Sequence, residues 1–247
     1  MTKTEWDYSA LAAYYDNRAD YAPAAIDFIV ATMGLAAGDQ VADVGAGTGK
    51  LARPLAQRGL AVNAVEPNDE MRKFGTANSQ GLPVNWRDGT GEQTGLAASS
   101  VGAVFFGSSF NVVNQVAALQ ECRRIVGPNG WFCCMWNHRD LDDPLQARIE
   151  AAIRGFIPDY NYGLRREDPS GVLADSGLFE GVSAFSAGFT TSMSKQTVMD
   201  AWRSHGTLAR QAGESFPAIL DAIDALLDGE VVEVPYTTRL WYARFQR

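Results

Sequence analysis

The sequence predicts an α/β protein, and three observations support this class. An apolar tetrapeptide at 41–44, typical of a short buried strand, runs into glycines at alternate positions and then into a predicted helix over 51–57. A second apolar run at 61–65 ends in an acid about twenty residues after these glycines. Predicted strands at 83–86, 101–106 and 131–136 then alternate with predicted helices at 69–78 and 115–126.

The glycine turn predicts a nucleotide-type ligand other than a dinucleotide. Its spacing is Gly-x-Gly-x-Gly, with Lys50 where a dinucleotide fingerprint has its third glycine. Asp43 would place a carboxylate beside a pyrophosphate, whereas a ligand with a cationic ammonium group would be attracted to it. Glu66, at the end of the second apolar run, stands where an acid accepts hydrogen bonds from ribose hydroxyls.

The arrangement Asp43-x-Gly45-x-Gly47-x-Gly49 resembles motif I of the class I S-adenosylmethionine (SAM)-dependent methyltransferases, and Glu66-Pro67 follows it at the required spacing. The segment from Glu121 to Gly130 is similar to the family's connection between a helix and the next strand. The resemblance covers nearly the whole chain and points to the small-molecule branch. It implies one domain over 1–247 with a doubly wound, seven-stranded, mostly parallel sheet and one antiparallel edge strand.

The resemblance also assigns cofactor contacts along the chain. Predicted SAM-binding residues lie in the glycine turn, after the second, third and fourth strands, and in the leader: Asp43, Gly45, Gly47, Gly49, Glu66, Pro67, Asp88, Gly89, Thr90, Gly107, Ser108, Tyr14, Arg18 and Tyr21. Relatives often carry an acid that accepts the adenine amino group after the third strand. Thr90 aligns with that acid and Asp88 lies two residues earlier, so either can supply the contact, and Asp88 is also a plausible turn former.

The aromatic leader over residues 5–22 has two interpretations. It is either an amphipathic helix packed on the domain through its tyrosines or, as in the methyltransferases that the chain resembles, a segment that covers the cofactor. In the second case tyrosine rings stack near a sulfonium and Arg18 pairs with a carboxylate. Together with a helix predicted over 24–33, the leader gives an N-terminal helical cap over 1–33.

Acceptor contacts are predicted at Asn111, Asn137 and Tyr15, which form the candidate catalytic set. Many relatives have a Phe-His-Trp-like triplet where this chain has Phe110-Asn111-Val112, so an obvious candidate base is missing. Asn111 is equally a candidate N-cap for the helix at 115–126. Asn137 follows the fifth strand, where it is either an acceptor contact or part of an ordinary polar loop.

The last third of the chain predicts a helical insertion over 141–180 at the active-site edge. Alternating segments at 182–189 and 236–245 predict two closing strands, with helices near 195–211 and 216–227 between them.

Bulk properties narrow the partners. A formal charge of −8 argues against nucleic-acid binding, and no apolar run is long enough to span a bilayer, so we expect a cytoplasmic monomer or homodimer with a small-molecule substrate. Cys122, Cys133 and Cys134 lack ligand-like spacing, so we expect no metal site and buried thiols.

Three functions remain open. The first is methyl transfer from SAM to a small organic acceptor, which leaves S-adenosylhomocysteine. The second is cyclisation of SAM itself to azetidine-2-carboxylate with release of methylthioadenosine, as in azetidine-2-carboxylate synthases of this fold. The third is a SAM-binding module without catalysis.

Overall fold

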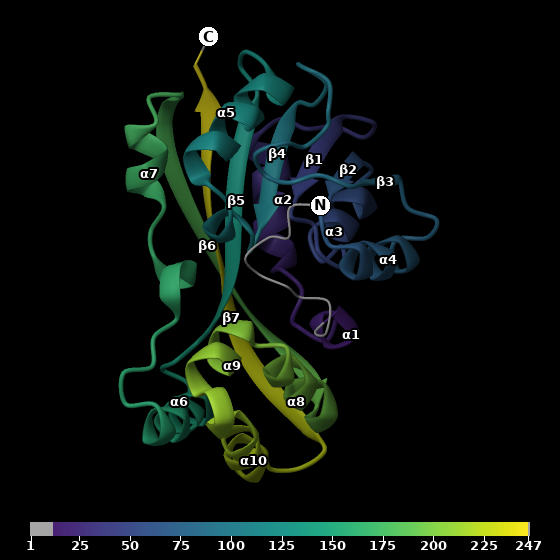
Figure 1. Cartoon of the computed structure of the whole chain (residues 1–247). Helices are drawn as coiled ribbons and strands as arrows, with labels where there is room; N and C mark the ends of the chain where they lie inside the picture. Colours follow the sequence, from purple (N-terminus) through teal and green to yellow (C-terminus); the bar gives the residue numbers. More distant parts are fainter. Residues whose placement is uncertain (1–11, 247) are drawn as a thin grey trace.

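The computed structural model describes residues 12–246, and one seven-stranded sheet runs through them (Figure 1). The strands are β1 (Gln40–Val44), β2 (Ala61–Val65), β3 (Val84–Arg87), β4 (Ala103–Gly107), β5 (Trp131–Arg139), β6 (Phe179–Ser194) and β7 (Val231–Phe245). Their order is β3-β2-β1-β4-β5-β7-β6. The first five are parallel to one another, and β7 pairs antiparallel with both β5 and β6. The predicted fold is confirmed, with an antiparallel pair at one edge in which β6 is outermost.

The helices predicted over 24–33, 51–57, 69–78 and 115–126 are found close to those bounds. The helices in the described residues are α1 (Ala12–Tyr15), α2 (Pro23–Thr32), α3 (Ala52–Gln57), α4 (Asp69–Asn78), α5 (Gln115–Val126), α6 (Pro144–Phe156), α7 (Ser170–Asp175), α8 (Lys195–Arg203), α9 (Gly206–Ala212) and α10 (Phe216–Leu226), with single turns η2 (Phe110–Val112), η3 (Gly163–Arg166) and η4 (Gly213–Ser215). Helices α4 and α5 have the predicted bounds, because Asn68 and Asn114 cap their first turns with side-chain oxygens. Among the helices described, none combines the length and apolar character needed to cross a bilayer.

Two hydrophobic cores cover the two faces of the sheet. Helices α2 and α3 pack on one face, where Ile26, Ile29 and Leu55 are fully buried. Helices α5 and α7 pack on the other face, where Leu119, Ile125 and Leu173 are buried. The strand residues on this face alternate along each strand with those on the first face. This doubly wound arrangement leaves the strand ends as the place for a ligand.

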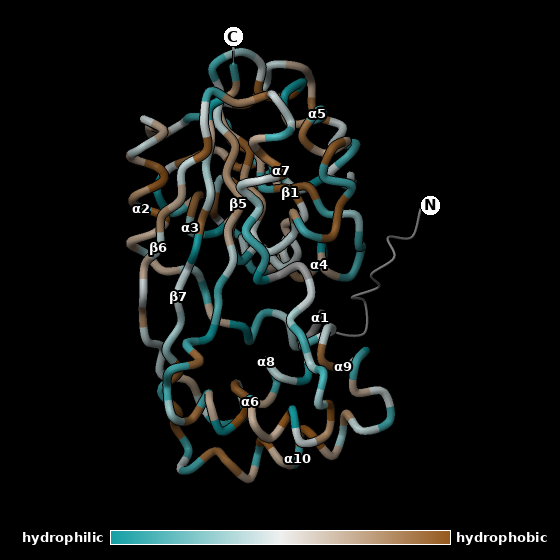
Figure 2. Tube along the Cα trace, turned by 90° about the vertical axis from the view of Figure 1, so that its left-hand side faces the viewer, coloured by the Kyte–Doolittle hydropathy of each residue, from teal (hydrophilic) through white to brown (hydrophobic). Residues whose placement is uncertain are grey.

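A third core lies beyond the sheet, because β6 and β7 run far past the shorter strands. Helices α6, α8, α9 and α10 pack around this overhang through buried side chains such as Ile153, Trp202, Ile223 and Val234. These four helices form a helical module at the far end of the two strands (Figure 1). Apolar stretches accordingly occur both in the sheet with its helices and in the module (Figure 2).

The module differs from the insertion predicted over 141–180. In that segment, α6 packs in the module through Ile149 and Ile153, whereas α7 packs on the sheet through Leu173. Most of the module comes instead from residues 195–226, between β6 and β7. The prediction was incomplete because the helical pattern of 195–226 does not show which end of the sheet the helices cover.

The strand order places the ligand site. The order in which the chain adds strands to the sheet reverses at β1. β2 and β3 are added on one side of β1, and β4 is added on the other side. Open α/β sheets bind ligands in the crevice outside the carboxyl ends of strands at such a point. The glycine turn after β1 and the loop after β4 therefore define the expected site.

Candidate active site

The glycine turn is held by the neighbouring strand. The amides of Gly45 and Ala46 donate hydrogen bonds of 2.8 and 3.0 Å to the carbonyl of Val65, the last residue of β2. The next amide, that of Gly47, donates to Oε2 of Glu66 at 2.8 Å, and the amide of Asn68 donates to Oε1 at 2.8 Å. The structure thus brings together the turn and the acid that the sequence spacing had connected.

Two of the glycines explain why no other residue serves in the turn. Gly45 has a φ of +68°, and a Cβ there would lie 2.6 Å from the Cβ of Ser109, so the position has neither the conformation nor the space for a side chain. Gly47 has a φ of +57°, but a Cβ would meet only the Met71 methyl group at 3.4 Å and the Tyr15 ring at 3.8 Å. Gly45 therefore packs tightly against the protein itself, whereas the space beside Gly47 is largely free of protein atoms.

Asp43 is the most unusual group of the site. It is fully buried at the end of β1, and neither carboxyl oxygen has a hydrogen-bond partner of ordinary geometry among residues 12–246. Burial raises the pKa of this carboxyl to about 8; the Ala52 amide opposes part of the rise, and the charge of Glu66 adds to it. A buried acid without a partner fits a site for a cationic group.

Burial also raises the pKa of Glu66, although the amides of Asn68 and Gly47 and the positive charge of Arg72 oppose the rise. Its carboxyl oxygens accept hydrogen bonds from the two amides, so its position relative to the turn is fixed before any ligand arrives.

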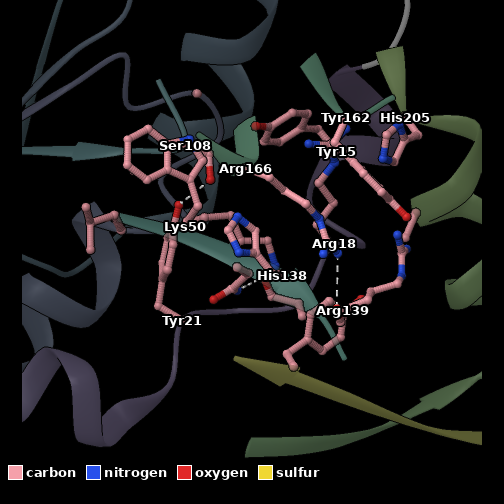
Figure 3. Close-up of a pocket in the computed structure, with 18 of the residues that line it drawn as sticks. Tyr15, Arg18, Tyr21, Lys50, Ser108, His138, Arg139, Tyr162, Arg166 and His205 are labelled. Atoms are coloured by element: carbon pink, nitrogen blue, oxygen red, sulfur yellow. Dashed lines mark hydrogen bonds between the residues drawn. The ribbon is translucent and has the colours of Figure 1, made fainter. Parts of the chain in front are cut away.

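A cavity opens from the glycine turn and continues between the sheet and the helical module (Figure 3). The predicted site residues that line it are Tyr15, Arg18, Tyr21, Asp43, Gly45, Gly47, Gly107, Ser108 and Asn137. The predicted residues that do not line it are Tyr14, Gly49, Glu66, Pro67, Asp88, Gly89, Thr90 and Asn111. Glu66 nonetheless touches the cavity wall through its bond to Gly47.

The leader covers one side of this cavity. Arg18 stacks over the Tyr15 ring at 4.2 Å and donates from Nε to the Ser204 hydroxyl at 2.9 Å. Tyr21 is buried, with its hydroxyl 3.0 Å from that of Ser108, and burial raises the pKa of the phenol. Tyr14 is 40% exposed, so its predicted cofactor contact has no support in the geometry.

The leader is not one long helix in its described part. Helix α1 ends at Tyr15, and residues 16–22 form an irregular segment that acidic side chains hold in place. Asp16 accepts from Arg53 at 3.0 Å, and Asp20 pairs with Lys50 at 2.9 Å. Of the predicted leader, residues 5–11 lie outside the described part of the chain.

The two predicted asparagines have structural partners. Asn137 lies within β5 and not after it; its Nδ2 donates to the Asp20 carbonyl at 2.8 Å, and its Oδ1 accepts from the Thr238 hydroxyl at 2.5 Å. It therefore positions the leader. Asn111 accepts from the Trp136 indole at 3.1 Å in η2, while Asn114 is the N-cap of α5, so the capping interpretation of Asn111 was wrong.

The loop after β3 does not line the cavity. The Asp88 side chain is 75% exposed and lies 3.6 Å from Arg72. Thr90 closes a turn with Gln93, accepting at its hydroxyl and donating from its amide. Gly89 packs closely, since a Cβ there would lie 2.8 Å from Val65. Neither adenine candidate is singled out by these contacts.

The outer half of the cavity was not predicted from the sequence. Its wall comes from the end of β5, α6, η3, α8 and β7, and includes His138, Arg139, Glu150, Tyr162, Arg166, Trp202, His205 and Tyr236. These residues come from several elements, and the pairing of β5 with β7 places Arg139 beside Tyr236. The one available signal was the density of aromatic and cationic residues in 136–166.

The cysteines are buried and unlinked, as expected. Burial raises the pKa of each thiol, so all three remain protonated near neutral pH. Over residues 12–246, no group of three His, Cys, Asp or Glu side chains is placed to hold a metal ion.

Sequence comparison identifies a methyltransferase domain in the central region. A family model described as "Methyltransferase domain" matches residues 42–134, which run from β1 through β5. An uncharacterized methyltransferase of Mycobacterium bovis is 38% identical over 133 residues, covering 53% of this chain and 52% of the relative. A ubiquinone/menaquinone biosynthesis C-methyltransferase of Rubrivivax gelatinosus is 32% identical over 136 residues, covering 52% and 53%. The chain thus spans about half the length of the curated relatives it matches.

Solved structures agree on the fold over the rest of the chain. A protein of Anaeromyxobacter dehalogenans, described as a candidate type II methyltransferase, superposes with a TM-score of 0.66 at 17% identity, covering 92% of this chain and 97% of the other. The strand order is that of the class I methyltransferase fold, and residues 42–134, which hold the glycine turn and its two acids, form a methyltransferase domain.

Proposed function

We propose that the protein transfers a methyl group from SAM to a small organic acceptor bound in the outer half of the cavity. The observation that carries the proposal is the continuity of this cavity. It begins at the unpartnered Asp43 and the glycine turn and extends past His138 to an aromatic chamber under the helical module. Cofactor and acceptor can therefore meet in one enclosed space.

The residues at the inner end fit SAM. Asp43 offers a buried carboxylate to the ammonium group, and the Glu66 carboxylate, already aligned by two amides, offers its remaining lone pairs to ribose hydroxyls. Tyr15 and Tyr21 place aromatic surface at the same end. SAM, when bound, supplies an electrophilic methyl group whose bond to sulfur breaks with its electron pair left on sulfur.

The protein's part in such a transfer is to position and to exclude water. Arg18, bound to Ser204 of the segment after α8, ties the leader across the cavity to the helical module, and Asn137 ties it to β5. These contacts hold the two ends of the cavity in a fixed relation, which favours an in-line attack. His138, labelled in Figure 3, lines the cavity and is a candidate to accept a proton from the acceptor.

The aromatic lining of the outer half of the cavity supports a flat acceptor. Trp202, Tyr236 and Tyr162 contribute rings to its wall. The Rubrivivax relative is named for C-methylation in ubiquinone and menaquinone biosynthesis. Quinones are ring compounds, and we propose that this chain too accepts a ring-bearing molecule.

One incubation separates methyl transfer from the alternatives. Pure protein with SAM alone should give no turnover, and S-adenosylhomocysteine should form when candidate acceptors are added. Release of methylthioadenosine without an acceptor would replace the proposal by SAM cyclisation, which has no need of the outer chamber. SAM binding without turnover across an acceptor panel would favour a binding module.

A further inference from the structure

Two arginines meet at the outer end of the cavity. Arg139 is the last residue of β5, and Arg166 is the last residue of η3. A guanidinium N–H of Arg166 donates to the Arg139 carbonyl at 3.2 Å, so the strand end and the turn are held together (Figure 3). Both side chains line the cavity.

Each guanidinium lies over the face of an aromatic ring. The Arg139 guanidinium carbon lies 3.9 Å from the centre of the Trp202 ring, and that of Arg166 lies 4.2 Å from the centre of the Tyr162 ring. Stacking of this kind uses the π face of the guanidinium and leaves N–H groups at its edge for a planar, bidentate partner.

No carboxylate among residues 12–246 lies within 4.0 Å of either guanidinium. The acid that shares this part of the wall, Glu150, already accepts a hydrogen bond from the Tyr162 hydroxyl and pairs with Arg154 at 2.9 Å. In a chain of net charge −8, two neighbouring half-buried cations without a counter-ion mark a place for an anion.

We propose that Arg139 and Arg166 bind a carboxylate of the acceptor, which makes the acceptor an aromatic acid. This inference rests on the proposed methyltransferase function. The stacked rings supply flat apolar walls, and the guanidinium edges supply the donors that fit a carboxylate.

Strand register favours an anchoring role for this carboxylate over its methylation. Asp43 pairs with Phe105, and Phe105 pairs with Cys133, so Arg139 lies six residues further along β5 than the level of Asp43. Six residues of strand are roughly 20 Å. An acid anchored at that distance points its other end, which carries the hydroxyl, amino or carbon nucleophile, toward the glycine turn.

The test uses the full chain saturated with S-adenosylhomocysteine, so that a probe cannot occupy the cofactor's own carboxylate site. Ligand-observed NMR compares hydroxybenzoic, hydroxyphenylacetic and hydroxycinnamic acids with their primary amides. We expect the acids to bind at least tenfold more tightly than the amides, and the double variant Arg139→Gln, Arg166→Gln to lose roughly tenfold or more of that affinity. Calorimetry measures S-adenosylhomocysteine affinity of each protein separately.

Arg244→Gln is the control, because the Arg244 guanidinium carbon also lies over an aromatic ring, 5.7 Å from the centre of Trp131, but Arg244 is in β7 opposite the first residue of β5. It should bind the acids like the wild type. Equal binding of acids and amides, absence of binding by any acid, or acid binding unchanged in the double variant would overturn the inference while leaving cofactor binding intact. A loss of S-adenosylhomocysteine affinity in the double variant would overturn it too, by assigning the arginines to the cofactor. Failure of the wild type to bind S-adenosylhomocysteine would instead refute the proposed function.

Discussion

Replacing Asp43 by Asn should stabilise the empty protein at neutral and alkaline pH and weaken its hold on the cofactor. The folded protein keeps the Asp43 proton up to a pKa of about 8, whereas the ordinary value is 3.8. Between these values the folded state binds more protons than the unfolded chain, so stability falls as pH rises. The slope is roughly 1.4 kcal/mol per pH unit, or about 4 kcal/mol between pH 5 and pH 8.

Urea unfolding at pH 5, 6, 7 and 8 measures the pH-dependent loss of stability as the difference in free energy of unfolding between wild type and Asp43→Asn. The variant's advantage should grow steadily with pH, whatever constant cost its buried amide adds. Parallel pH profiles of the two proteins would refute the assignment of the raised pKa to Asp43.

The affinity for the cofactor should rise with pH, whereas the stability of the empty protein falls. An ammonium group favours ionised Asp43, so binding below pH 8 releases a proton, and wild-type affinity for S-adenosylhomocysteine should rise with pH up to about 8. Asp43→Asn should bind roughly 10- to 100-fold more weakly at pH 8, since a hydrogen bond to a charged group contributes about 1.5–3 kcal/mol. Calorimetry in two buffers of different ionisation enthalpy counts the released proton; identical proton release by variant and wild type would contradict the contact.

Three further predictions concern the turn and the leader. Glu66→Ala should lower S-adenosylhomocysteine affinity at least tenfold, since it removes charge-assisted hydrogen bonds of about 1.5–3 kcal/mol each. Calorimetry on a variant with native circular dichroism measures this, and unchanged affinity would exclude the ribose contact. NAD should not bind the wild type measurably. Gly47→Val should abolish binding, because a β-branched residue resists a φ of +57° in the glycine turn. The control Gly34→Val, with a φ of +66° and open space around it, should bind normally by the same assay. Native-like affinity of Gly47→Val would show that the turn tolerates rearrangement. Amide exchange of residues 14–22 should slow when S-adenosylhomocysteine is added, and equal, strong protection in both states would make the leader ordinary packing.

The inner half of the site could be predicted because its signals are local. Gly45 needs a positive φ and lies against Ser109, and a strand, a turn and a second strand of fixed length bring Glu66 to the Gly47 amide. Such features leave a spacing in the sequence. Asn68 and Asn114 fixed the starts of α4 and α5 in the same local way.

Roles that depend on a distant partner were not predicted. Asn137 looked like an acceptor contact because it lies near the ligand edge, but Asp20 and Thr238, both about a hundred residues away in sequence, use both ends of its amide. The Asn111 side chain is likewise bound to Trp136. A polar residue in a sequence does not show whether its hydrogen bonds are directed to a ligand or to the chain itself.

The difference in strand length explains why the two halves of the cavity differ so much in predictability. β1 and β2 have five residues each, whereas β6 has 16 and β7 has 15, so the closing strands extend tens of ångströms beyond the cofactor end. The helical module that covers the acceptor end is built on this overhang, and Arg139 reaches it only because β5 follows β7 to Tyr236. A change in the helices between β6 and β7 can therefore reshape the acceptor chamber without disturbing the glycine turn. In the proposed function, the short strands therefore carry the cofactor end and the long strands carry the acceptor end.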